Sequence, residues 1–380
     1  MGKTSLVREL VRRLKEDGSF ETIFVDLEAA DTPADVIAEI GIKSRSVQGV
    51  WRRLNSWLAN IMPAEFSIGG RVDALGSADL RVKLRAGIDP GNWRQKGDEL
   101  FAALAGNSRP VVLAIDELPI LVNRLLKGHD YRITPERRQA VDQFLSWLRK
   151  NGQTHRGRIS MILSGSVSLE PILEQAELSA HANIFRPFEL KPWDGDTAAD
   201  CLAALAESYG IELPEPVRQD ICHRLRCQIP HHVQAFFDSV HEYLRRARRS
   251  KASLEDIERV YDGDMLGVRG QMDLEHYQSR LRMVLGSAGY RIALELLTEA
   301  AVSGGVLHDD FIDRYCTHIG ARTENPEAEP VAIENILHVL EHDGYLAKES
   351  DGYRFVSGLL EDWWRARYGQ RFVPIEQRKF

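Results

Sequence analysis

A short run at the start of the chain has the residue types that bind phosphate. It consists of Gly2, Lys3, Thr4 and Ser5, the second half of the pattern G-x-x-x-x-G-K-[ST], and a helical pattern follows directly. Glycine lets backbone N–H groups approach phosphate oxygens, and a helix N-terminus adds the positive end of its dipole. Lys3 would contact the β- and γ-phosphates, and the Thr4 hydroxyl would complete the ligand shell of a Mg²⁺ ion. The run alone also fits an ordinary helix start with a threonine or serine cap.

A pair of carboxylates follows a buried strand pattern later in the chain. Residues 111–115 read VVLAI, and Asp116 and Glu117 come next. Ligands of α/β sheets bind at the carboxyl ends of the strands. Asp116 would hold the Mg²⁺ through water, and Glu117 would orient and deprotonate an attacking water. Alone, the pair also fits a strand that runs into a charged loop, but both motifs in this order favour nucleotide hydrolysis.

Two further positions fit the same chemistry. Ser164 follows the strand pattern at 159–163 in a Ser-Gly-Ser turn, where a small polar side chain could report on the γ-phosphate. Arg186 is an isolated arginine in the apolar segment 184–188. It is either a surface residue or a phosphate-sensing cation, supplied within the chain or to a neighbour.

The elements that must position these residues alternate between strand and helix. Helices are expected at 4–15, 32–40, 46–61, 98–104, 134–149 and 169–176. Strands are expected at 22–27, 111–115, 159–163 and 184–190. Residues 66–87 alternate more like a β-hairpin, with Gly76 near its turn. This order predicts an α/β fold with a parallel sheet wrapped by helices.

The second half of the chain is mainly helical. A bundle is expected from helices at 196–209, 215–226, 230–249 and 253–261. Three later helices and a hairpin are the parts of a winged helix, expected at 290–301, 307–315, 331–342, 345–348 and 353–356. The predicted domains are therefore a core at 1–192, a helical lid at 193–284 and a winged helix at 285–380.

The order GKTSL, VDLE, VVLAIDELP, ILSGS and FRPFELKPW resembles the archaeal-type ATPase family, which is AAA+-like and is grouped near the signal-transduction NTPases. Residues 353–368 look like the end of the winged helix that its bacterial members carry. The resemblance implies a P-loop NTPase sheet with ATP and Mg²⁺ as cofactors, and the choice of ATP over GTP rests on it alone. By this resemblance, Lys3 and Thr4 belong to the phosphate loop, and Asp116 and Glu117 are the metal-and-base pair. Ser164 matches the first sensor, and Arg186 matches a recurrent arginine.

The sequence departs from the family pattern at two places. Members have a central strand and a glycine-containing loop before GKT, whereas this sequence starts at Met1. We therefore expect a start further upstream that restores the loop, and the alternative is an impaired site. At the position of a second sensor, residues 229–232 (IPHH) offer histidines and no arginine.

Composition and charge restrict the class of protein. The 43% apolar and 28% charged residues are ordinary for a globular protein, and we expect a cytoplasmic protein without a membrane segment. The four cysteines are too sparse for a disulfide framework. The net charge of −7 favours no nucleic-acid partner, and residues 285–370 hold 7 Lys or Arg against 15 Asp or Glu.

Metal-binding and DNA-binding interpretations have less support. Cys222 and Cys227 lie five residues apart on an expected helix, so buried thiols fit better than zinc ligands. The expected recognition helix at 331–342 has no Lys or Arg, although duplex binding needs cations for the phosphates. A basic cluster at 245–251 suits a helix C-terminus.

The leading hypothesis is Mg²⁺-dependent ATP hydrolysis that switches the lid and winged helix between arrangements, with a protein partner or self-association. Two alternatives remain, an adaptor that binds nucleotide weakly and presents an acidic winged helix, and a DNA-linked regulator.

Overall fold

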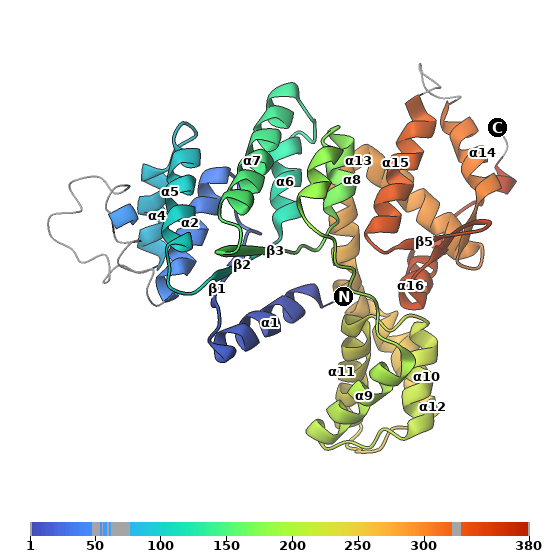
Figure 1. Ribbon diagram of the computed structural model, residues 1–380. Helices are drawn as coiled ribbons and strands as arrows, with labels where there is room; N and C mark the ends of the chain where they lie inside the picture. The colour runs from blue at the N-terminus through green and yellow to red at the C-terminus, as the bar shows by residue number, and fades with distance from the viewer. Residues whose placement is uncertain are drawn as a thin grey trace. The chain divides into compact units, whose positions relative to one another are not determined.

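The computed structural model describes residues 2–47, 54, 56–58, 61, 77–320 and 328–378 (Figure 1). The chain divides into two compact units, Lys3–Pro187 and a second unit of Phe188–Phe380 with Met1–Gly2. Within the described ranges, no helix has the length and apolar character needed to cross a membrane.

The first unit is built on a parallel sheet in the order β1-β2-β3, with strands β1 (Glu21–Asp26), β2 (Val111–Asp116) and β3 (Ile159–Leu163). All residues of β2 are buried, because this strand is central in the sheet and helices cover both faces. Asp26 pairs with Asp116 and Ile115 pairs with Leu163, so the three carboxyl ends lie at one edge. The structure thus confirms the expected parallel sheet and three of its strands.

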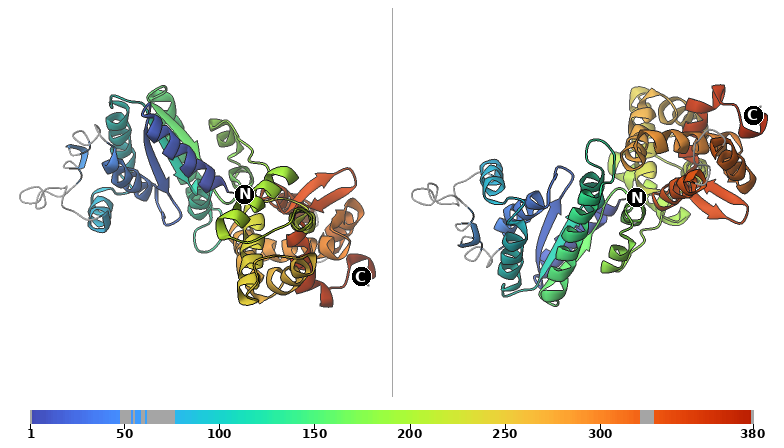
Figure 2. Two further views of the ribbon diagram at one scale, coloured as in Figure 1. Left: turned by 90° about the horizontal axis from the view of Figure 1, so that it is seen from below. Right: turned by 90° about the horizontal axis from the view of Figure 1, so that it is seen from above.

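Helices lie on both faces of this sheet (Figures 1 and 2). One face carries α1 (Lys3–Asp17), and the other carries α6 (Leu118–Lys127) and α7 (Pro135–Thr154). Val7 is the buried residue of α1. The unit also contains α2 (Pro33–Lys43), α4 (Ser77–Gly87), α5 (Trp93–Ala105), α8 (Leu169–Gln175) and the 3-10 helices η1 (Ser44–Ser46) and η4 (Ser179–Ile184).

The start of α2 follows from its sequence. Thr32 Oγ1 accepts a hydrogen bond from the Asp35 backbone N–H at 3.2 Å, and Asp35 Oδ2 accepts one from the Thr32 N–H at 2.9 Å. This reciprocal pair satisfies two N–H groups that a helix start leaves without partners. Pro33 occupies the first turn, where its missing N–H has no cost.

Residues 77–87 form α4, so the hairpin prediction is wrong there. Leu80 and Leu84 are buried, but Val82 between them is 68% exposed. A strand would place all three side chains on one face, whereas a helix brings only residues four apart together. Residues 66–76, and most of the helix expected at 46–61, lie outside the described residues.

The strand expected at 184–190 does not form. Residues 185–190 have no regular secondary structure, and Phe188 is 80% exposed. A strand needs a neighbour to satisfy its backbone N–H and C=O groups. Within the described residues, β3 pairs with β2 alone and no strand pairs with this segment.

The second unit begins with the expected helices, here α9 (Gly195–Tyr209), α10 (Glu215–Leu225), α11 (Pro230–Arg246) and α12 (Leu254–Val260). A π-helical turn, η5 (Tyr261–Met265), follows them. The long helix α13 (Val268–Val302) comes next and is interrupted at Gly286, whose φ of 66° and ψ of −175° are not helical.

The C-terminal part of this unit contains a second, antiparallel sheet in the order β4-β6-β5, with β4 (Val306–His308), β5 (Leu346–Glu349) and β6 (Gly352–Phe355). The helix expected at 307–315 starts later, because Val306–His308 pairs with β6. The helices here are α14 (Asp309–Gly320), α15 (Ala328–His342) and α16 (Gly358–Tyr368), with η6 (Gly369–Arg371) and η7 (Ile375–Gln377) after them. Trp363 and Trp364 are buried on α16.

Candidate functional site

The first turn of α1 carries the residues expected to contact phosphate. Lys3 is the first residue of the helix, and Gly2 precedes it with a φ of 78°, a left-handed conformation that glycine adopts without strain. The N–H groups of a first helical turn have no acceptors within the helix. Lys3 and Thr4 are half-buried, whereas Ser5 is exposed. The structure therefore presents Lys3 and Thr4 at a helix N-terminus, an arrangement that suits an anion.

Thr4 and Asp116 meet although they lie far apart in the chain. The Thr4 hydroxyl donates a hydrogen bond of 2.7 Å to Asp116 Oδ2. Asp116 ends the buried strand β2 and is 2% exposed. A buried carboxylate needs hydrogen bonds to offset the loss of water. The packing of α1 against the sheet thus joins the two motifs that the sequence pairs in one site.

Ser164 completes the hydrogen bonds of Asp116. Its hydroxyl donates to Asp116 Oδ1 at 2.6 Å, and its backbone N–H donates to the Ile115 carbonyl at 3.0 Å. The backbone bond extends the pairing of β2 with β3 by one step beyond the end of β3. Ser164 therefore lies beside the acidic residue at the carboxyl edge of the sheet, as the sequence predicts.

Glu117 has an unusual backbone conformation and an unexpected partner. Its φ of 60° and ψ of 26° are left-handed, which is uncommon for a residue with a side chain. It occupies the N-cap position of α6 but does not cap that helix with its side chain. Instead, Glu117 Oε2 accepts hydrogen bonds from the Ser166 N–H at 2.8 Å and the Ser166 hydroxyl at 2.9 Å.

Arg186 is the predicted site residue that the structure does not bring into this network. Its side chain is exposed and lies in the irregular segment after η4. Among the described residues, the hydrogen bonds of Thr4, Asp116, Glu117 and Ser164 do not involve it.

The residues at this edge fit a magnesium ion in their chemistry. Thr4 offers a hydroxyl oxygen and Asp116 a carboxylate oxygen, and the two atoms are already neighbours. Mg²⁺ prefers oxygen ligands and takes one or two from the protein, with the rest from water and phosphate. Lys3, one residue before Thr4, would add a positive charge suited to phosphate oxygens.

Solved structures of other proteins align with almost the whole chain. A Walker-type ATPase of Pyrococcus abyssi aligns with a TM-score of 0.55 and 16% sequence identity, over 96% of this chain and 88% of that chain. This chain has the fold of a Walker-type ATPase.

Two proteins of Aeropyrum pernix also align. The ORC2 protein, solved as ADPNP–ADP complexes, has a TM-score of 0.43 and 11% identity over 97% of this chain and 86% of its own. The ORC1 protein, solved in complex with DNA, has a TM-score of 0.40 and 14% identity over 96% of this chain and 84% of its own. The sequence matches no protein-family profile and no curated protein.

Within this Walker-type fold, Ser166 is the residue of the network that sequence reasoning missed. A serine in a turn has no periodic signature. The signal that the sequence offered was the second serine of Ser-Gly-Ser, two residues after Ser164. If Ser164 bonds to one of the two acidic residues, this second hydroxyl could donate to the other.

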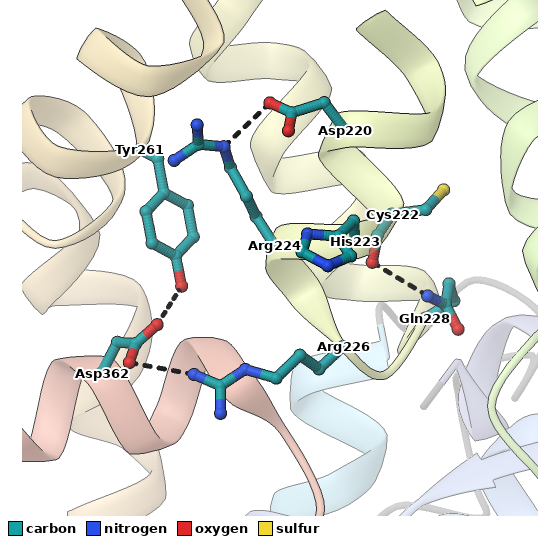
Figure 3. A pocket seen from close by; sticks show the side chains of 8 residues that line it. All are labelled: Asp220, Cys222, His223, Arg224, Arg226, Gln228, Tyr261 and Asp362. Atoms are coloured by element: carbon teal, nitrogen blue, oxygen red, sulfur yellow. Dashed lines mark hydrogen bonds and ion pairs between the residues drawn. The ribbon is translucent and has the colours of Figure 1, made fainter. Parts of the chain in front are cut away.

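A separate cavity of about 740 Å³ lies in the second unit (Figure 3). Asp362 in its lining accepts two hydrogen bonds. Arg226 donates to Asp362 Oδ1 at 3.0 Å, and the Tyr261 hydroxyl donates to Asp362 Oδ2 at 2.8 Å. Arg224 on the same wall is paired with Asp220 at 2.8 Å. The charged groups of this cavity thus satisfy one another.

The cysteine and histidine residues near this cavity do not form a metal site. In Figure 3 the thiol of Cys222 points away from Arg226 and Asp362. No group of three or more His, Cys, Asp or Glu suited to a metal ion occurs among the described residues. Burial raises the pKa of the Cys222 and Cys227 thiols, as for thiols packed inside a protein.

The basic cluster at the end of α11 also has acidic partners. Arg245 pairs with Glu242 at 2.7 Å, Lys251 pairs with Glu212 at 2.5 Å, and Arg249 pairs with the buried Asp256. These contacts agree with the interpretation of the cluster as a helix C-terminus.

Proposed function

We propose that this chain is a Mg²⁺-dependent ATPase of the P-loop, AAA+-like class. The observation that carries the proposal is the 2.7 Å hydrogen bond between the hydroxyl of Thr4 and the carboxylate of Asp116. It joins a helix N-terminus suited to phosphate with an acidic strand end suited to a metal ion. The alignment with a Walker-type ATPase supports the same fold for the rest of the chain.

Each residue of the network has a task in this proposal. Bound Mg²⁺–ATP supplies the reactive γ-phosphorus and a metal ion that neutralises phosphate charge. Lys3 would hold the β- and γ-phosphates, and the N–H groups from Gly2 to Ser5 would donate to phosphate oxygens. Thr4 and Asp116 would hold the metal ion. Glu117 orients the attacking water and accepts its proton, as a general base does.

Two residues are assigned to sensing. Ser164 bonds to Asp116 at 2.6 Å, so a change at the γ-phosphate that moves Asp116 would also move the loop after β3. Arg186 is exposed, which suits a cation that reaches phosphate after a rearrangement or serves a neighbouring copy.

We further propose that the three predicted domains, 1–192, 193–284 and 285–380, are a core, a lid and a winged helix that respond to nucleotide. The antiparallel sheet β4-β6-β5 with α14 and α15 has the parts of a winged helix. Since α15 contains Glu334 and Glu341 and no Lys or Arg, a protein partner or a second copy fits it better than duplex DNA.

Isothermal titration with ATP and Mg²⁺ tests the proposal. We expect Lys3→Ala to weaken ATP binding by about tenfold or more, because it removes a charged contact to phosphate. Lys15→Ala is the matched control, since Lys15 lies exposed in the last turn of the same helix and should leave binding unchanged. Equal heats for the wild-type chain and Lys3→Ala would reject the enzyme and favour an adaptor.

A further inference from the structure

The loop after β3 pairs its two serines with the two acidic residues after β2. Ser164 donates its hydroxyl to Asp116, and Ser166 donates both its N–H and its hydroxyl to Glu117. We propose that Ser166 is a positioning residue that fixes the carboxylate of Glu117 for its work as general base. This inference rests on the proposed ATPase function.

The position of Glu117 makes such support necessary. An N-cap side chain that accepts a hydrogen bond from the first turn of its own helix is fixed by that bond. Glu117 lacks this bond, because its side chain reaches the neighbouring loop instead. Both Ser166 bonds, at 2.8 and 2.9 Å, end on the same oxygen, Oε2. Neither of these bonds uses the other oxygen, Oε1, to which we assign the contact with the attacking water.

The residue between the two serines shows how tightly the loop and the acidic turn are packed. A Cβ atom on Gly165 would lie 2.5 Å from Cδ of Pro119 and 3.5 Å from Oε2 of Glu117. Only glycine lets the loop approach α6 this closely. The serine hydroxyl therefore meets Glu117 within a packed turn and not at a freely moving surface.

Steady-state ATP hydrolysis by the full chain tests this role. We expect Ser166→Ala to lower kcat about tenfold with KM changed less than twofold, because the base is misplaced and nucleotide contacts are intact. Ser166→Thr retains a hydroxyl and should restore kcat. Ser160→Ala, the same change at an exposed residue of β3, should behave as the wild type.

A double variant separates this role from a structural one. In a Glu117→Gln background, Ser166→Ala should cause no further loss, because Ser166 acts only through Glu117. The inference is overturned if Ser166→Ala leaves kcat undiminished, or if it lowers kcat a further tenfold in the Glu117→Gln background. Either result leaves the proposed function standing as long as ATP binding depends on Lys3. If the wild-type chain shows no Lys3-dependent ATP binding, the proposed function fails and this inference fails with it.

Discussion

Asp116 and Glu117 follow one another at the end of β2, yet their carboxylates receive hydrogen bonds from different groups. Asp116 is 2% exposed and accepts bonds from Thr4 and Ser164, which come from α1 and from the loop after β3. Glu117 is half-buried and accepts its bonds from Ser166. The difference suits the tasks proposed for them, since a metal ligand needs a fixed site and a general base needs access to water.

A second residue with an unusual environment is His232 on α11. It is 1% exposed, with Nε2 lying 3.1 Å from the Tyr277 hydroxyl and Nδ1 lying 3.3 Å from the Ser357 hydroxyl. Burial, with a smaller effect of His231, lowers the pKa of His232 to about 3. The imidazole at the position of the expected second sensor is therefore neutral and held inside the second unit.

This environment predicts a dependence of stability on pH. The unfolded chain binds a proton at His232 below pH of about 6.5, whereas the folded chain does so only near 3, so stability falls as the pH falls between these values. We expect a loss of about 1–2 kcal/mol in unfolding free energy from His232 between pH 7 and pH 5. Urea denaturation at both values should show a smaller loss for His232→Gln than for the wild type. The exposed His223→Gln should keep the wild-type dependence, and an equal loss in His232→Gln would contradict the assignment.

At the scale of elements, the sequence predicted the helices and strands that are marked by residues within or next to the element itself. The helix expected at 32–40 corresponds to α2 (Pro33–Lys43), and the apolar run at 111–115 marked the buried strand β2. The segment 184–190 has a strand-like composition, but pairing depends on a neighbouring strand and not on composition. The segment 77–87 was misassigned because its alternation competes with the helical spacing of Leu80 and Leu84.

Most residues of the candidate site could also be predicted from local patterns. GKT, the Asp116–Glu117 pair and Ser164 each stand at the end of an element that the sequence marks, so a parallel sheet must bring them to one edge. The partnership of Ser166 with Glu117 depends on the left-handed turn at Glu117, and no pattern in the sequence predicts that conformation.

Helices α10 and α16 are joined by an ion-pair cluster within the second unit. Arg226, the residue after α10, bonds to Glu361 at 2.5 Å and to Asp362 at 3.0 Å. Figure 3 shows the bond to Asp362. Glu361 is 3% exposed and also pairs with Arg365. Arg226 has a left-handed φ of 55°. The cluster thus ties the predicted lid segment to the predicted winged helix.

Removing the arginine of this ion-pair cluster should destabilise the second unit. We expect Arg226→Ala to lower the unfolding free energy by about 1–3 kcal/mol, because a buried carboxylate loses one of its two cations. Thermal unfolding of the full chain measures the effect. Arg245→Ala removes an exposed arginine that pairs within its own helix, and it should leave the melting temperature unchanged. Equal melting temperatures for both variants would show that the cluster contributes no stability.

At the scale of the whole molecule, the alignment with a Walker-type ATPase covers 96% of the chain and therefore both units. The side chains proposed to bind phosphate, the metal ion and water all lie in the first unit, on α1 and at the ends of β2 and β3. The second unit supplies none of them and has its own buried core and ion pairs. This division agrees with our proposal that nucleotide is bound in the first unit and that the second unit responds to it.

The most direct test of the account is the binding of Mn²⁺, as a paramagnetic substitute for Mg²⁺, measured by electron paramagnetic resonance with and without ATP. Thr4 and Asp116 are proposed to hold one metal ion together with the nucleotide. The wild-type chain should bind one Mn²⁺ only when ATP is present, and Thr4→Val and Asp116→Asn should each weaken that binding at least tenfold. Binding of Mn²⁺ that is independent of ATP, or that is equal in the wild type and both variants, would contradict the account.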